Sequence, residues 1–149
     1  MPLFQKINED MKAAMKSGDK ARLEVLRFTL ASLNPVQKEK ALKDPQAVLS
    51  DEEVIAILQK EAKKRKDSIE LFKQGNRADL VTKEEGDLKV IYEYLPAELS
   101  RDEIVAMVVA AKANGANDFS SIMKEVMKLA KGRADGKMVG DVIRDVERG

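Results

Sequence analysis

The sequence predicts an all-α protein, with an N-terminal domain of about four helices and a small C-terminal tail domain of three helices. Apolar residues recur every three or four positions along most of its 149 residues, as they do on the buried face of a helix. Two Ser-x-x-Glu sequences, beginning at Ser50 and Ser100, match the capping box that starts a helix. No segment alternates apolar and polar residues strictly enough to indicate a strand.

Four helices are expected in the N-terminal domain, at about residues 3–17, 20–43, 51–74 and 77–95. Pro35 lies inside the second of them. Proline removes one helical hydrogen bond and disfavours helical geometry in the residue before it, so we expect a kink or break there. Gly86 lies inside the fourth helix, where glycine often marks the close approach of another helix.

A domain boundary is expected at Leu95-Pro96, because Pro96 ends the fourth helix and Ser100 starts a new one. We therefore expect domains at residues 1–96 and 97–149. The first two tail helices end at Gly115 and Gly132, and the third starts after Asp135, an N-cap residue. The expected tail core contains Ile104, Val108, Phe119, Ile122, Val126, Leu129, Val139, Val142 and Ile143.

The composition excludes several chemistries. The chain has no cysteine and no histidine, so it forms no disulfide, no Ser-His-Asp or Cys-His triad and no metal site built on those ligands. No catalytic constellation is found, and neither a cofactor nor a bound metal is expected. The net charge is only +1, so any surface that binds nucleic acid must be a local patch.

No apolar segment has the length of a signal peptide or of a membrane-spanning helix. We therefore expect a cytoplasmic protein that does not bind membranes.

The densest positive charge lies in the third helix, at Lys63, Lys64, Arg65 and Lys66. One interpretation is an ordinary solvated helix face, and the other is a patch that contacts RNA phosphates. Arg65 stands out because it falls within the apolar stripe of that helix. It is either a buried, ion-paired arginine or an arginine directed into a groove.

A second basic cluster surrounds the last turn in the tail, where Lys128, Lys131, Arg133 and Lys137 flank Gly132. Gly132 and Asp135 can be explained as helix caps alone. Alternatively, the cations and the free amides at the start of the last helix form a phosphate-binding site.

Three stretches together resemble the YqeY family in their sequence and spacing: residues 64–69, 93–100 and 131–137. The tail also resembles the tail domain of GatB, the tRNA-binding subunit of glutamine-dependent aminoacyl-tRNA amidotransferases. The resemblance departs at Asn34-Pro35, where the family pattern implies an unbroken helix. The resemblance as a whole implies a helical domain joined to a three-helix tail that contacts tRNA. The family is also described as a carbon–nitrogen ligase that uses glutamine as amido donor.

The chain is too short for the kinase-like part of the full amidotransferase subunit and lacks an amidase Ser-Ser-Lys site. The leading hypothesis is therefore a non-catalytic tRNA-binding accessory protein. One alternative is a protein-interaction module that docks on an amidotransferase or an aminoacyl-tRNA synthetase, and a third is participation in the ligase reaction itself. The residues expected to bind nucleic acid are Lys63, Lys64, Arg65, Lys128, Lys131, Gly132, Arg133 and Lys137.

Overall fold

The computed structural model describes all 149 residues and confirms the all-α prediction: it contains seven helices and no strand. The chain divides into two compact units, Met1–Leu95 and Pro96–Gly149, a division one residue before the boundary expected from the sequence. The helices are α1 (Leu3–Ser17), α2 (Lys20–Lys43), α3 (Asp51–Gln74), α4 (Ala78–Tyr92), α5 (Arg101–Ala113), α6 (Phe119–Ala130) and α7 (Gly136–Arg148).

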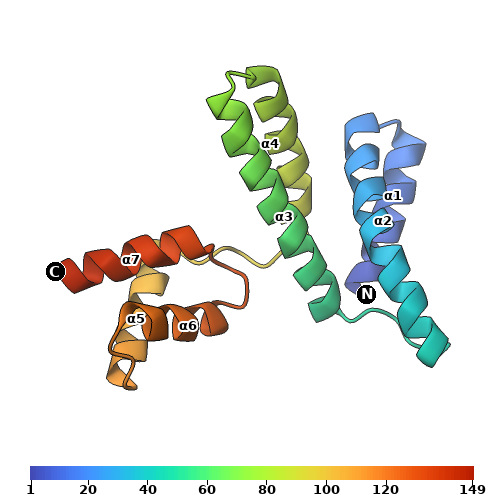
Figure 1. Cartoon of the computed structure of the whole chain (residues 1–149). Coiled ribbons are helices and arrows are strands. Elements are labelled where there is room, and N and C mark those ends of the chain that lie inside the picture. Colours follow the sequence, from blue (N-terminus) through green and yellow to red (C-terminus); the bar gives the residue numbers. More distant parts are fainter. The chain divides into compact units, whose positions relative to one another are not determined.

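The N-terminal unit consists of two helical hairpins, α1–α2 and α3–α4 (Figure 1). Contacts are most extensive within each hairpin and sparser between the two hairpins. The apolar core nevertheless joins them, because fully buried side chains from both hairpins belong to one cluster. This cluster includes Ile7, Leu26, Leu33, Leu58 and Ile91.

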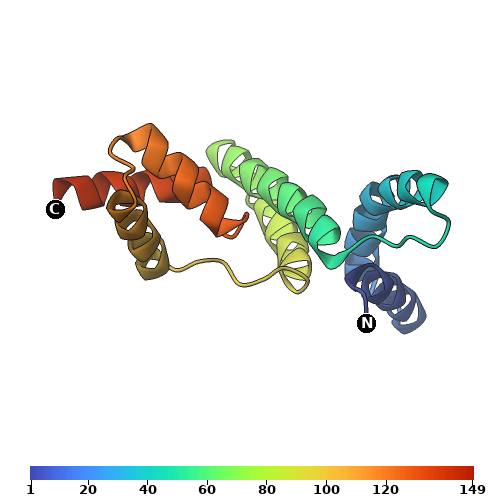
Figure 2. The ribbon, with the colours of Figure 1, turned by 90° about the horizontal axis from the view of Figure 1, so that it is seen from below.

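The helix α2 is continuous through Pro35, so of the kink or break expected there, the break is wrong (Figure 2). Pro35 and Ala31 are both exposed, so water can solvate the Ala31 carbonyl that proline leaves without a backbone donor. Beyond Pro35, the side chain of Gln37 holds the helix to the following loop. Its Nε2 donates to the Ala47 carbonyl and its Oε1 accepts from the Leu49 amide, both at 2.8 Å.

The capping box at the start of α3 is confirmed: the Ser50 hydroxyl accepts from the Glu53 amide and the Glu53 carboxylate accepts from the Ser50 amide. The explanation offered for Gly86 is wrong. No atom lies within 4 Å of the position that a Cβ of Gly86 would occupy, so no helix approaches it closely. Glycine is therefore not required there for packing.

The tail unit packs α5, α6 and α7 around their own core, which includes Ile104, Ile122, Val126, Val139 and Ile143. Two residues expected in that core lie largely outside it, because Phe119 is 41% exposed and Leu129 is 47% exposed. The predicted N-cap of α7 is confirmed, since Asp135 Oδ1 accepts from the Met138 amide at 2.8 Å. No helix in either unit combines the length and apolar character needed to cross a membrane.

Candidate functional site

The tail loop, residues 131–135, joins α6 to α7 and contains three of the residues expected to bind nucleic acid. It opens with two residues in the left-handed conformation, Lys131 with φ 49° and Gly132 with φ 79°. Glycine adopts this conformation without steric cost, whereas lysine rarely does. Gly132 is therefore required by the turn itself, whatever the loop binds.

Arg133 clamps the tail loop to the segment that leads into α5. Its Nε donates to the Ala97 carbonyl at 2.8 Å, and its own carbonyl accepts from the Leu99 amide at 2.8 Å. Leu99 is 5% exposed and belongs to the tail core, so this clamp holds the first buried residue of the unit in place. Arg133 thus has a structural role that the sequence did not reveal. Its terminal Nη groups make no hydrogen bond or ion pair within the protein.

The start of α7 is less open to anions than the sequence suggests. The Asp135 carboxylate already accepts from the Met138 amide and brings a negative charge to the helix N-terminus. A phosphate at the tail loop would therefore depend on lysine and arginine side chains more than on free amides.

Three exposed lysines surround the tail loop. Lys128 lies in the last turn of α6, Lys131 opens the loop and Lys137 lies in the first turn of α7. Lys128 and Lys137 form no ion pair with any carboxylate of the protein. Lys128 and Lys137 therefore present cations that the acids of the protein do not neutralise, while nucleic-acid binding by the tail lysines stays a prediction.

The other predicted nucleic-acid residues belong to α3 in the N-terminal unit. Lys63 and Lys64 are exposed and form no ion pair, as expected for an outer helix face. Lys66 differs, because its ammonium lies over the Tyr92 ring at 5.5 Å from the centroid. Of this cluster, only Lys63 and Lys64 are exposed cations that form no ion pair.

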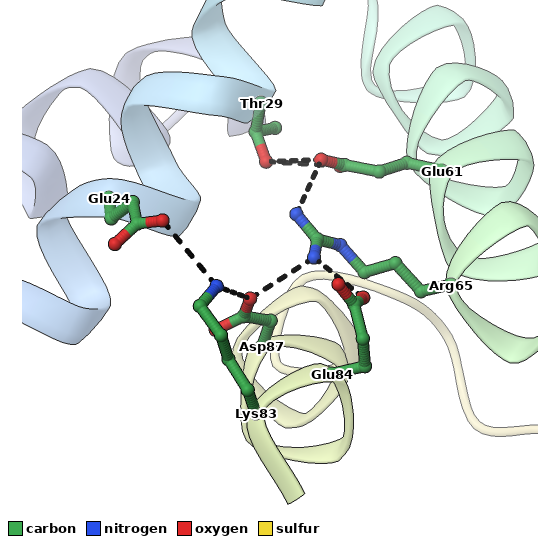
Figure 3. A network of polar contacts seen from close by, with 7 residues as sticks. All are labelled: Glu24, Thr29, Glu61, Arg65, Lys83, Glu84 and Asp87. Atoms are coloured by element: carbon green, nitrogen blue, oxygen red, sulfur yellow. Dashed lines mark hydrogen bonds and ion pairs between the residues drawn. The ribbon is translucent and has the colours of Figure 1, made fainter. Parts of the chain in front are cut away.

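Arg65 is the centre of a polar network that joins α2, α3 and α4 (Figure 3). Its Nη1 lies 3.0 Å from Glu84 Oε2 and 3.2 Å from Asp87 Oδ2, and its Nη2 lies 3.7 Å from Glu61 Oε1. The Thr29 hydroxyl donates to the Glu61 carboxylate at 3.0 Å, which links the network to α2.

The edge of the network is more exposed than its centre. Lys83, 53% exposed, extends it to Asp87 at 3.2 Å and to Glu24 at 3.5 Å. The side chains of Arg65 and Glu61 are 13% and 7% exposed. The buried, ion-paired interpretation of Arg65 is therefore confirmed. Three carboxylates already surround its guanidinium, so this geometry does not favour a phosphate contact.

Burial raises the pKa of Glu61 above its ordinary value, although the Thr29 hydroxyl and Arg65 both favour the ionised form. The network is also incomplete, since the buried Arg65 Nε has no hydrogen-bond partner. An unsatisfied buried donor costs about 1–3 kcal/mol. The network therefore specifies how the two hairpins meet, and part of its stabilisation is offset by this unsatisfied group.

Sequence reasoning missed the acidic partners of Arg65. A partial signal exists, because Glu61 and Arg65, like Lys83 and Asp87, are four residues apart on one helix and can pair on its surface. That spacing does not reveal that Glu84 and Asp87 of α4 reach Arg65 of α3. Within the whole structure, no group of three or more acidic side chains is arranged to hold a metal ion.

Comparison with known proteins identifies a family for this chain. The model of a family described as Yqey-like protein matches residues 4–146. A protein of Pyrenophora tritici-repentis named altered inheritance of mitochondria protein 41, mitochondrial, is 31% identical, and the match covers 97% of this chain and 80% of that protein.

Two further relatives come from yeasts. The Saccharomyces cerevisiae (strain YJM789) protein named altered inheritance of mitochondria protein 41 is 31% identical over 79% of this chain and 64% of its own length. An uncharacterized protein of Schizosaccharomyces pombe is 33% identical over 63% of this chain and 72% of its own length. The names of the Pyrenophora tritici-repentis and Saccharomyces cerevisiae relatives place those two proteins in mitochondria. The cytoplasmic localisation expected for this chain stays a prediction. With a family model that spans nearly all of its seven helices, the chain belongs to the YqeY family.

Proposed function

We propose that this chain is a non-catalytic accessory protein that binds tRNA through its tail loop. The observation that carries the proposal is the set of exposed lysines, Lys128, Lys131 and Lys137, around a loop whose backbone Arg133 and Gly132 hold in one shape. Contacts to nucleic-acid phosphates need only such positioned cations.

The choice of tRNA rests on the resemblance of the tail to the tail domain of the amidotransferase subunit that binds tRNA. Membership of the YqeY family supports this proposal without identifying the ligand. Lys63 and Lys64 extend the proposed contact set to the N-terminal unit. Arg65 is left out of it because its guanidinium is paired with Glu61, Glu84 and Asp87.

The proposal excludes catalysis by this chain alone. The one pair of adjacent serines, Ser120 and Ser121, has an ordinary structural explanation. Asp118 and Ser121 form the capping box of α6, with the Ser121 amide 2.7 Å from Asp118 Oδ1. We expect the purified chain to release no ammonia from glutamine, with or without tRNA. Release in proportion to enzyme concentration would support the ligase alternative.

A filter-binding titration with total tRNA across a range of salt concentrations tests the proposal. The informative variant replaces Lys128, Lys131 and Lys137 by alanine and keeps Arg133, whose loss would disturb the clamp on Ala97. If the three lysines contact phosphates, the slope of log K against log salt should become shallower by about two to three.

The matched control replaces Lys12, Lys16 and Lys38 by alanine. These lysines are exposed and form no ion pair, so their replacement removes the same amount of positive charge as the tail variant. Equal loss of affinity in both triple variants would show that only the overall charge matters. Undiminished affinity in the tail variant would exclude the tail loop as the binding site. A chain that binds no tRNA, but retains protein partners after nuclease treatment, would favour the interaction-module alternative.

A further inference from the structure

The N-terminal unit contains a half-open cavity of about 330 Å³ between α2, α3 and α4, and Arg65 and its ion-pair partners form part of its wall. Its volume lies at the lower end of the range for ligand pockets, which suits one side chain or a small molecule. Its lining combines an apolar wall from Val25 and Phe28 with the carboxylates of Glu84 and Asp87 on the facing helix. This cavity plays no part in the proposed binding of tRNA by the tail loop.

The two carboxylates on α4 have acceptor capacity that the protein does not use. Arg65 and Lys83 occupy Glu84 Oε2 and Asp87 Oδ2, whereas no protein donor reaches Glu84 Oε1 or Asp87 Oδ1. Their side chains are only 21% and 13% exposed, and both residues line the cavity. An ionised carboxylate has about four acceptor sites, and a ligand that donates hydrogen bonds can use the vacant ones.

The net charge of the cavity lining determines whether a cationic or an anionic ligand is favoured. Four carboxylates and three cationic groups line it, and one of these cations, Lys64, has no carboxylate partner. The lining is therefore negative in total, and its two paired cations are already committed to the carboxylates. A cationic donor is favoured here and a phosphate is disfavoured.

The apolar wall selects the shape of the ligand. Phe28 is 57% exposed although it lines the cavity, and one face of its ring already lies against the Arg65 guanidinium, 5.2 Å from centroid to Cζ. Planar guanidinium groups stack on aromatic rings and donate paired hydrogen bonds to carboxylates, whereas a lysine ammonium is a compact point charge.

We propose that this cavity binds the guanidinium group of an arginine side chain presented by a protein partner. The guanidinium donates to Glu84 Oε1 and Asp87 Oδ1, and the aliphatic stem lies against Val25 and Phe28. A peptide-borne arginine suits the cavity better than free arginine, because the negative lining repels the α-carboxylate that only the free amino acid carries. This inference does not depend on the proposed binding of tRNA and would stand if that proposal were wrong.

Titration of the full chain with Nα-acetyl-L-arginine amide, followed by backbone amide chemical shifts in NMR spectra, tests the inference. We expect saturable shifts confined to the segments that line the cavity, around residues 24–28, 61–68 and 83–87, and weaker binding of Nα-acetyl-L-lysine amide. The F28L variant should weaken binding about two- to fivefold, the equivalent of about 0.5–1 kcal/mol for an exposed cation–π contact.

The F119L variant is the matched control. Phe119 is 41% exposed and also stacks on an arginine, with Arg144 Cζ 5.0 Å from the ring centroid, but it lies in the tail unit. Binding to F119L should equal that of the wild type. Absence of saturable shifts, equal weakening by F28L and F119L, or tighter binding of free L-arginine or of a nucleotide at the same amides would each overturn the inference.

Discussion

The replacement of Arg65 by methionine tests whether the buried network holds the two hairpins together. Methionine retains most of the volume but removes the cation that faces Glu61, Glu84 and Asp87. Removing one partner of a buried ion pair costs about 3–5 kcal/mol, because the remaining charge is left uncompensated. The variant also removes the unsatisfied Arg65 Nε, whose burial costs about 1–3 kcal/mol. We therefore expect a net loss of about 2 kcal/mol in the free energy of unfolding.

The pH dependence of that loss tests the part that Glu61 plays in it. Burial already raises the pKa of Glu61 in the folded protein, and loss of Arg65 raises it further. A carboxyl group with a raised folded pKa stabilises the fold at low pH, and this contribution is lost as pH rises through the folded pKa. The difference between R65M and wild type should therefore be smaller near pH 5 than near pH 7.

Urea denaturation followed by far-ultraviolet circular dichroism measures both effects. The double variant E61Q/R65M should recover part of the loss, because glutamine still accepts from Thr29 and carries no charge. An R65M variant at least as stable as the wild type near pH 7, or a double variant no more stable than R65M, would refute this account of the network.

Three further changes probe other parts of the N-terminal unit by the same denaturation assay. G86A should stabilise the protein by about 1 kcal/mol, because Gly86 is inside α4 with open space around it; a loss of stability would contradict this. Y94F should destabilise it by about 1–2 kcal/mol, because the Tyr94 hydroxyl donates to Asp10 at 2.6 Å and accepts from Arg22 at 3.1 Å. Burial alone would raise the pKa of Asp10, but the hydrogen bonds from Tyr94 and Lys6 lower it overall. The stabilisation by the Tyr94–Asp10 hydrogen bond should therefore be lost as pH falls through the lowered pKa of Asp10. Q37A should cost about 1–3 kcal/mol, because it leaves the Leu49 amide and the Ala47 carbonyl without their partner, and it should speed hydrogen exchange in residues 36–43; unchanged exchange would exclude the anchoring role of Gln37.

Local signals in the sequence were sufficient for most helix boundaries. The caps at Ser50, Ser100 and Asp135 depend on residues within four positions of each other. Such signals act through the backbone of one turn, so they can be recognised without knowledge of the rest of the fold. The Asp118 cap of α6 has the same local form but was overlooked, because its partner is Ser121 where glutamate or glutamine is usual.

Distant contacts explain the errors. Pro35 is tolerated because it faces solvent and because Gln37 bonds to residues 47 and 49, which are ten and twelve positions away. The structural role of Arg133 depends on Ala97, which is 36 positions away. Neither partnership leaves a periodic trace in the sequence.

The sequence by itself determined that this chain is helical, which faces of most of its helices are apolar and which lysines flank Gly132, because each of these depends on residue type and short-range spacing. Only the tertiary structure decided what Arg65 does. An arginine in an apolar stripe is compatible with burial or with a groove. The choice required Glu61 one turn away, Glu84 and Asp87 on another helix and Thr29 on a third, since a buried charge persists only where the fold supplies its counter-charges.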